Sequence, residues 1–437
     1  MLYERWRQIV RERGGECALR ELFSGRQWTF AELARLAEGA PAASQPMTFP
    51  RGHDAGFVFA VLQAWRSNCM VCPMEADQKA PRVTSLPPAH CLHLKTTSAT
   101  TGAPRFVAFT AEQLAADAEN IVATMGLRRD WPNVAAISLA HSYGFSNLVL
   151  PLLLHGIPLL IAPSPLPEIF RQAIIRAKVP GFTLPSVPAL WRAWHTARAI
   201  PDNVRLAISA GAPLPLALET GVFSTTGIKI HNFYGSSECG GIAYDATPVP
   251  RTVESCAGRP MRNVDLQIGE AGCLEVRGKA VGETYWPTPS GALMAGCFKT
   301  SDLVEIVNGE VHLRGRLADQ INVAGRKVSP AAIEQVLLEH DQVAECLAFG
   351  VPSADADRAE DIIACIVAKS PVSGEELKQF LLRKIPAWQI PREWWFVDSV
   401  AGNRLGKVSR AQWRQEFLKR KRPPQTIPPL ANPRGRR

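Results

Sequence analysis

The sequence predicts an α/β fold with a large, multi-subdomain N-terminal domain and a smaller α+β C-terminal domain. Three observations lead to this prediction. Apolar helical and strand-like segments alternate between residues 56 and 162, short strands between glycine-rich turns follow from residue 264, and a mixed pattern begins after residue 316. Strand–helix alternation predicts a parallel sheet covered by helices on both faces. The short strands predict a small antiparallel sheet or β-barrel.

The elements of the first region follow from apolar spacing. A segment with helical spacing leads into a buried apolar run, Cys-Met-Val-Cys-Pro, and the same succession recurs further along the chain. The predicted elements in order are a helix over 56–65, a strand over 69–73, a helix over 114–126, a strand over 134–139, a helix over 147–154 and a strand over 158–162.

The region after residue 316 reads as a compact α+β domain of about a hundred residues. We expect helices over 330–338 and 374–383, and strands over 343–351, 362–368 and 394–397. The expected domains are therefore 1–315, 316–412 and a basic, proline-rich, disordered tail over 413–437.

Composition narrows the class of protein. The chain has 437 residues, 46% of them hydrophobic and 20% charged, which suffices for a large core in two or more domains. The longest apolar stretch, Leu148–Ala162, is interrupted by two prolines and a glycine and is too short for a membrane span. Because no apolar signal region follows the first charges and ten cysteines are scattered, we expect a cytoplasmic protein with reduced thiols.

Two further patterns have a structural and a functional interpretation. Residues 411–437 carry eight Lys/Arg against one Glu, or +7 of the net charge of +9, and such a tail can bind nucleic acid, acidic lipid or an acidic protein. Basic tails are more often only solvated, so nucleic acid is not an expected partner. Cys69-x-x-Cys72 with Cys91-x-His93 could hold zinc, but its apolar context favours a buried strand.

Five segments in a fixed order carry the functional signal. The first, Lys95-Thr-Thr-Ser-Ala-Thr-Thr-Gly-Ala-Pro-Arg105, combines small residues, hydroxyls and a positive charge, which suits a loop that wraps a polyphosphate. The others are Asn232-Phe-Tyr-Gly-Ser-Ser-Glu238, Thr300-Ser-Asp302, Gly315-Arg316 and Asn403-Arg-Leu-Gly-Lys407.

Together these segments resemble the core motifs of the AMP-forming adenylating enzymes, which include acyl-CoA synthetases, peptide-synthetase adenylation domains and firefly luciferase. The resemblance runs from about Trp28 to about Arg410 and is closest in type to acyl-CoA synthetases. It implies that the N-terminal domain binds ATP and the acyl substrate and that a mobile C-terminal domain caps it. The short distance from Asp77 to the phosphate loop implies a trimmed first subdomain.

The resemblance implies an ATP-dependent ligase that converts an apolar, fatty or aromatic carboxylic acid to acyl-AMP and passes it to a thiol. The thiol acceptor is either CoA or the phosphopantetheine of an acyl carrier protein, and the sequence leaves both open. Lys407 bridges the carboxylate and the α-phosphate, Arg105 adds charge at the phosphate loop, and His141 lies where relatives have a gate beside the carboxylate pocket. Glu238 holds Mg²⁺.

The implied nucleotide and thiol contacts come from each motif in turn. Tyr234 stacks on adenine and Asn232 reads its amino group, whereas Asp302 accepts the ribose hydroxyls. Gly325 matches the glycine that lets a pantetheine arm pass close to the backbone. The complete set of expected binding residues is Thr97, Ser98, Thr100, Thr101, Gly102, Gly211, Ala212, Pro213, Asn232, Tyr234, Gly235, Ser237, Asp302, Arg316 and Gly325.

Some positions depart from the family pattern. Ala99 replaces a usual glycine in the phosphate loop, and Ala318 stands where relatives have Asp or Lys as the hinge pivot, with Asp319 shifted by one. These departures motivate an alternative, a catalytically inactive scaffold that still binds an adenylate. Retention of Lys407 and Glu238 favours the enzyme, because loss of activity is expected to release such polar residues.

Overall fold

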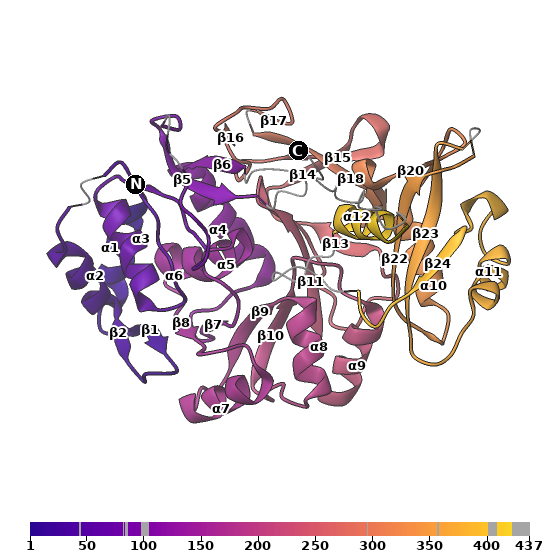
Figure 1. The fold of residues 1–437 in the computed structure, drawn as a ribbon. Helices are drawn as coiled ribbons and strands as arrows, with labels where there is room; N and C mark the ends of the chain where they lie inside the picture. The colour runs from indigo at the N-terminus through magenta and orange to yellow at the C-terminus, as the bar shows by residue number, and fades with distance from the viewer. Residues whose placement is uncertain are drawn as a thin grey trace, which may run out of the picture. The chain divides into compact units, whose positions relative to one another are not determined.

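The computed structural model describes residues 1–42, 45–81, 83, 86–97, 105–294, 296–355, 358–400 and 409–421 (Figure 1). The chain folds as two compact units, Met1–Leu317 and Ala318–Arg437. Among the described helices, none is both long enough and apolar enough to cross a membrane.

A 14-stranded sheet runs through the larger unit, and its first half is mainly parallel. Only the edge strand at this end is antiparallel to its neighbour. In sheet order these strands are β2 (Gln27–Thr29), β1 (Cys17–Glu21), β8 (Leu159–Ile161), β7 (Asn133–Ala135), β9 (Phe182–Ser186), β10 (Val204–Ser209) and β11 (Ile230–Ser236).

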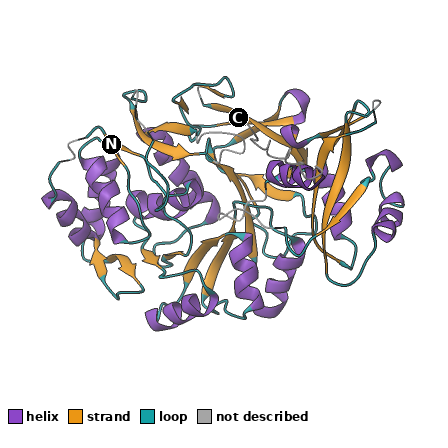
Figure 2. Cartoon of the chain, in the orientation of Figure 1, coloured by secondary structure: helices purple, strands orange, loops and turns teal. Residues whose placement is uncertain are grey.

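Alternate residues of these strands enter two different cores. In β10, Leu206 and Ile208 belong to one buried apolar cluster, whereas Ala207 belongs to the other. Each cluster is completed by helices, so the predicted parallel sheet with two covered faces is confirmed (Figure 2). One face carries α7 (Pro167–Ala177), α8 (Pro188–Thr196) and α9 (Leu216–Thr226); the other carries α1 (Leu2–Arg13), α2 (Phe30–Gly39), α3 (Ala55–Arg66), α4 (Ala111–Met125), α5 (Ser142–Gly144), the π-helix η1 (Phe145–Val149) and α6 (Leu150–His155).

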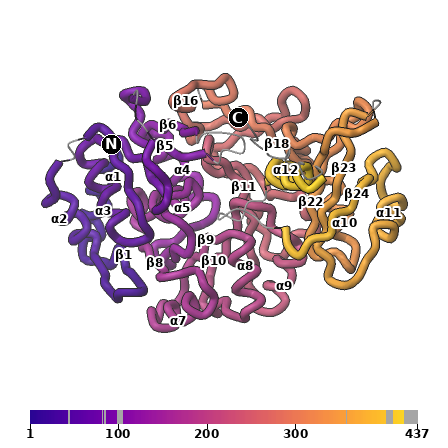
Figure 3. Tube along the Cα trace, in the orientation of Figure 1, coloured from indigo at the N-terminus to yellow at the C-terminus, as the bar shows by residue number. Residues whose placement is uncertain are grey.

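A second, five-stranded sheet packs on the far side of the helices α3 and α4. The helix α4 contacts both sheets, and the first three helices cluster together at the N-terminus (Figure 3). The helix α4 begins after a capping box formed by Thr110 and Gln113, and it ends at the left-handed C-cap Gly126. The strands are β16 (Thr284–Trp286), β6 (Phe106–Thr110), β5 (Cys91–Thr96), β4 (Met70–Val71) and β3 (Met47–Thr48).

The antiparallel strands predicted after residue 264 continue the long sheet. β11 pairs in the antiparallel direction with the next strand, and the sheet then proceeds to its other edge. In sheet order the strands are β12 (Gly240–Tyr244), β13 (Cys256–Pro260), β19 (Glu310–Arg316), β18 (Cys297–Val307), β15 (Cys273–Arg277) and β14 (Asp265–Ile268), with β17 (Leu293–Met294) beside β18 and the 3₁₀ turn η2 (Glu270–Gly272) before β15.

The smaller unit has the predicted α+β composition, and the two helices and three strands that the sequence predicts there lie within two residues of the expected bounds. Its three-stranded sheet has one antiparallel and one parallel pairing. The elements are β20 (Ile321–Val323), β21 (Arg326–Val328), α10 (Pro330–Leu338), β22 (Val343–Pro352), β23 (Glu360–Ala368), α11 (Gly374–Leu382), β24 (Glu393–Phe396) and α12 (Arg410–Lys421), with 3₁₀ turns η3 (Leu317–Asp319) and η4 (Ala387–Gln389).

The expectation that disorder begins at residue 413 is wrong for residues 413–421, which form most of α12. Phe417 is 5% exposed and lies in a cluster with Phe349 and Trp395, at ring-centroid distances of 6.0 and 5.6 Å. Charge dominates the composition here, but one buried apolar face is enough to hold a helix. Residues 422–437 lie outside the described residues.

A buried charge cluster ties α9 to the segments around β11 and β13. Lys229 binds Glu219 and lies 2.6 Å from Asp245, and Arg251 Nε lies 2.8 Å from Glu219. All four side chains are at most 6% exposed. Removing one member of such a group leaves an unpaired buried charge, which costs more than the pair contributes.

We therefore expect Glu219→Gln to lower the free energy of unfolding by about 3 kcal/mol. The measurement is urea unfolding followed by tryptophan fluorescence. Arg171→Ala, which breaks an exposed ion pair with Glu168, is the control and should leave the midpoint nearly unchanged. Equal midpoints for the two variants would contradict this assignment.

Candidate active site

One corner of the candidate site forms where β11 meets β18 and β19. The Tyr234 hydroxyl donates to Asp302 Oδ2 at 2.5 Å, and Arg316 Nε donates to Asp302 Oδ1 at 2.9 Å. Asp302 and Arg316 are paired across the two strands, so the register of the hairpin creates this contact. Burial, and then the Asp302 carboxylate, raise the pKa of Tyr234 well above its usual value. The phenol is therefore neutral and remains a donor to Asp302 at physiological pH.

The same strand positions a buried amide beside this corner. Asn232 Nδ2 donates to the Cys256 carbonyl at 3.2 Å, which leaves the amide oxygen as the atom suited to accept from an amino group. Asn232 is in register with Ser209 at the end of β10. Gly211, which follows, has φ +83°, a conformation that favours glycine. Gly211, Ala212 and Pro213 thus leave the sheet next to Asn232.

The turn between β11 and β12 presents a hydroxyl and a carboxylate. Ser237 Oγ lies 2.9 Å from Ser142 Oγ, and Glu238 Oε1 accepts from the Tyr285 hydroxyl at 3.1 Å. Gly235 permits the close strand pairing here, since a Cβ at this position would lie 2.6 Å from the Gly240 carbonyl oxygen. Burial is the main cause that raises the pKa of Tyr285, followed by Glu238, so this hydroxyl also stays a donor.

The two ends of the predicted phosphate loop close beside that turn. Arg105 O accepts from Thr97 N at 2.8 Å and from Thr97 Oγ1 at 3.0 Å. The Arg105 guanidinium carbon lies 4.0 Å from the centre of the Tyr285 ring, which places the cation next to the residue that binds Glu238. Ser98, Thr100, Thr101 and Gly102 lie outside the described residues.

His141 begins the short helix α5, and its Nδ1 accepts from Tyr143 N at 3.3 Å. The next residue, Ser142, is the one hydrogen-bonded to Ser237, so the segment that begins at His141 contacts the β11–β12 turn. Gly144 is required by a close backbone approach, because a Cβ there would lie 1.9 Å from the Ser138 carbonyl oxygen.

Lys95 has a structural role that its motif did not suggest. The residue is 2% exposed, and its ammonium donates to Asp117 Oδ2 and Ser146 Oγ, both at 2.9 Å. Its charge is therefore neutralised by Asp117 inside the core and is not directed at a phosphate. The first segment of the sequence motif combines a core lysine with the loop that begins at Thr97.

The smaller unit holds two of the predicted features. Gly325 lies in the β20–β21 turn with φ +79°, after Ala324 at φ +51°, as expected for a tight two-residue hairpin turn. Asp319 accepts from Arg410 at 3.0 Å, and Arg410 also binds Glu334 at 2.6 Å. Lys407 lies outside the described residues, three positions before this anchored arginine.

The structure brings together Thr97, Arg105, Ser237 and Glu238 in one group, and Tyr234, Asp302 and Arg316 in another. Sequence reasoning missed Tyr285 and assigned no role to Ser142. Ser142 directly follows the predicted gate residue His141, so its place in the sequence was a usable signal. Tyr285 belongs to none of the five segments and is brought to Glu238 by the pairing of β16 with β6.

Comparison with known proteins identifies the class to which this fold and site belong. The sequence model for the AMP-binding enzyme family matches residues 53–296, and that for the AMP-binding enzyme C-terminal domain matches residues 332–407. The chain therefore belongs to the AMP-binding enzyme family, within the AMP-forming adenylating enzyme superfamily.

Similar curated proteins include feruloyl-CoA synthase of Amycolatopsis sp, which is 26% identical over 75% of this chain and 70% of its own length. Long-chain-fatty-acid--CoA ligase of Escherichia coli O157:H7 is 28% identical over 76% of this chain and 62% of its own length. The ATP-bound MatB structure from Rhodopseudomonas palustris has a TM-score of 0.82 at 18% identity, covering 95% of this chain and 99% of that one, which supports the fold.

Asp302→Asn is expected to raise the dissociation constant for AMP by about tenfold to a hundredfold, because it removes the charged acceptor between Tyr234 and Arg316. Isothermal titration with AMP measures the change. Asp265→Asn, at an exposed position of the same sheet, is the matched control. Unaltered AMP affinity in Asp302→Asn would contradict the placement of the ribose at this corner.

Proposed function

We propose that this protein is an ATP-dependent, AMP-forming acid–CoA ligase that acts on an apolar carboxylic acid, fatty or aromatic. Family membership supports the adenylation chemistry. The names of similar proteins, feruloyl-CoA synthase and long-chain-fatty-acid--CoA ligase among them, support a carboxylic acid and CoA as substrates. The single observation that carries the proposal is the Tyr234–Asp302–Arg316 corner, in which Tyr234 belongs to β11, the strand that leads into the turn with Ser237 and Glu238.

In the first step the substrate carboxylate oxygen attacks the α-phosphorus of ATP, and the bond to pyrophosphate breaks. In the second step the thiol sulfur attacks the acyl carbon and AMP leaves. Negative charge gathers at phosphorus in the first step, so catalysis depends on positioned cations and donors. In this proposal Asp302 accepts from the ribose, Ser237 donates to the α-phosphate, and Arg105 and Lys407 supply positive charge.

Glu238 fits the family's Mg²⁺ requirement. Tyr285 donates to Glu238 Oε1 and so holds this carboxylate in the β11–β12 turn. Because the hydrogen bond uses Oε1, Oε2 is left for a cation. A carboxylate oxygen supplemented by phosphate oxygens and water is the environment that Mg²⁺ prefers. When bound, the ion would neutralise phosphate charge; the chain's own contribution is to position the carboxylate.

Two glycines that follow the turn with Glu238 have a packing role. A Cβ at Gly240 would lie 2.0 Å from Asp117 Oδ1, and one at Gly241 would lie 2.2 Å from Met261 Sδ. These glycines allow α4 and Met261 to pack against β12. The acyl pocket is therefore not opened by the missing side chains at these two positions.

The proposal predicts carboxylate-dependent release of pyrophosphate from ATP and Mg²⁺ for some acid in a panel of aliphatic and aromatic acids. Lys407→Ala should reduce that rate at least about a hundredfold, since electrostatic groups at the transition state contribute on this scale. Lys369→Ala, an exposed lysine of the smaller unit, is the control. Thioester formation is then followed with CoA and, separately, with an acyl carrier protein.

Pyrophosphate release that persists in Lys407→Ala would overturn the assigned role of this lysine. A wild-type protein that binds AMP but releases no pyrophosphate with any acid would favour the adenylate-binding scaffold. Thioester formed only on the carrier protein would replace CoA by phosphopantetheine as the acceptor.

Tyr285→Phe should raise the Mg²⁺ concentration needed for half-maximal pyrophosphate release by about tenfold, because one charge-assisted hydrogen bond to Glu238 is lost. A Mg²⁺ titration at saturating ATP measures the shift. Tyr244→Phe, another buried tyrosine of the same unit, serves as the control. A shift shared by both variants would indicate a general effect on stability.

A further inference from the structure

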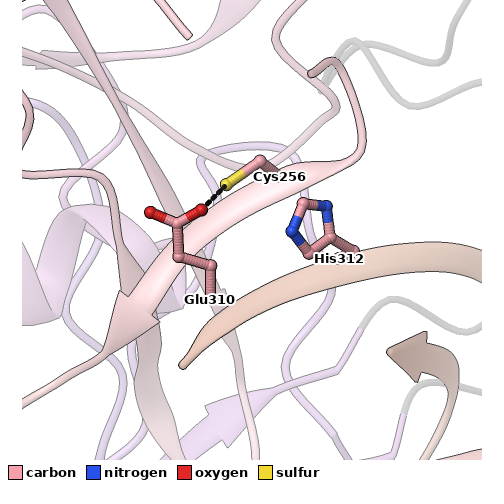
Figure 4. A group of neighbouring side chains, drawn as sticks. All are labelled: Cys256, Glu310 and His312. Atoms are coloured by element: carbon pink, nitrogen blue, oxygen red, sulfur yellow. Dashed lines mark hydrogen bonds between the residues drawn. The ribbon is translucent and has the colours of Figure 1, made fainter. Parts of the chain in front are cut away.

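A cysteine, a glutamate and a histidine converge where β13 and β19 pair, in the larger unit (Figure 4). Cys256 is the cross-strand partner of His312, and Glu310 precedes His312 by two residues and so projects from the same face of β19. The sulfur, a carboxylate oxygen and a ring nitrogen all lie within 4.8 Å of one another, and Cys256 Sγ lies 3.8 Å from Glu310 Oε2. Figure 4 shows the three side chains directed toward one another.

The surroundings of this cluster favour a built site. Cys256 and His312 are 8% and 7% exposed, and Glu310 is partly buried. The pairing of β13 with β19 is irregular between Cys256 and Gly258, where φ is +94°. A bulge of this kind redirects a side chain from its regular position. Ser255 Oγ lies 3.4 Å from His312 Nδ1, which leaves Nε2 as the nitrogen for a ligand.

We propose that Cys256, Glu310 and His312 bind one divalent transition-metal ion, with Zn²⁺ the best match. One sulfur, one imidazole nitrogen and one carboxylate oxygen form a donor set that Zn²⁺ takes readily, whereas Mg²⁺ and Ca²⁺ prefer oxygen alone. Tetrahedral zinc bonds of about 2.0 to 2.3 Å place ligand atoms about 3.3 to 3.7 Å apart. Small rotations of the Glu310 and His312 side chains would bring the three ligand atoms to these separations. Water completes the fourth position.

The zinc pattern weighed in the sequence, Cys69-x-x-Cys72 with Cys91-x-His93, is not brought together as a ligand cluster among the described residues. Cys69 Sγ contacts the Gln45 carbonyl, and His93 lies fully buried with its ring centroid 4.3 Å from that of Phe145. Cys256 lies 54 positions before Glu310, so no short sequence motif contains the whole cluster.

The position of the cluster gives the metal a structural role. The Cys256 carbonyl accepts from Asn232 on the adenine side, whereas β19 ends in Arg316 on the ribose side. A metal bound to both β13 and β19 would hold these two sides of the nucleotide site together. This consequence rests on the proposed function, but the metal site itself does not.

The experiment is a titration of the full-length, chelator-treated protein with Co²⁺, followed by absorption spectroscopy. We expect one Co²⁺ per chain, with a thiolate-to-cobalt charge-transfer band that disappears when Zn²⁺ is added and persists when Mg²⁺ is added. Cys256→Ser should abolish the band, and His312→Gln and Glu310→Gln should each weaken Co²⁺ and Zn²⁺ binding by about tenfold or more.

Cys273→Ser is the matched control, because it removes a half-buried thiol from β15 of the same sheet. Its band should equal that of the wild type. Circular dichroism verifies the fold of each variant. If Cys256→Ser does not fold, the metal affinities of His312→Gln and Glu310→Gln, which retain the thiol, test the proposal. Wild-type protein without the band, or binding that survives His312→Gln and Glu310→Gln, would overturn the proposal. The cobalt readout uses no nucleotide, so it is independent of ligase activity.

Discussion

Strand β11 is paired in parallel with β10 on one side and antiparallel with β12 on the other, and the candidate site of the larger unit depends on that change of direction. Ligands of α/β sheets bind at the carboxyl ends of the parallel strands. Asn232 and Tyr234 lie toward this end of β11, and the reversal into β12 places Ser237 and Glu238 in the turn. The antiparallel strands that follow then return Asp302 to Tyr234.

Several glycines around the candidate site of the larger unit permit close backbone packing. Gly235 allows β11 to approach the Gly240 carbonyl, and Gly144 allows its helix to approach the Ser138 carbonyl, at distances that exclude any side chain. At Gly240 and Gly241, the space that a Cβ would take is occupied by the side chains of Asp117 and Met261. These glycines therefore meet packing requirements, because protein interiors leave few voids.

Buried and exposed positively charged residues of the larger unit have different roles. Lys95 and Lys229 are buried beside carboxylates and stabilise the fold, whereas the side chain of Arg316 is 57% exposed beside Asp302. A partly exposed cation can bind an incoming anion at lower desolvation cost than a buried one, which is already neutralised. Exposure thus separates a candidate site cation from structural cations of the same charge.

The sequence by itself determined the fold class, most element positions in the smaller unit and the identity of the family, because apolar periodicity and the order of short motifs are local properties of the chain. The predicted helix over 330–338 coincides with α10. The tertiary structure decided which distant side chains meet. Tyr285 reaches Glu238 through the β16–β6 pairing, Lys95 is withdrawn into the core by Asp117, and Cys256 faces His312 through the β13–β19 register. The segment around Phe417 has the composition of a disordered tail but forms a helix, because Phe417 packs into a buried apolar cluster. These contacts depend on strand register and packing between segments far apart in sequence, which no local pattern encodes.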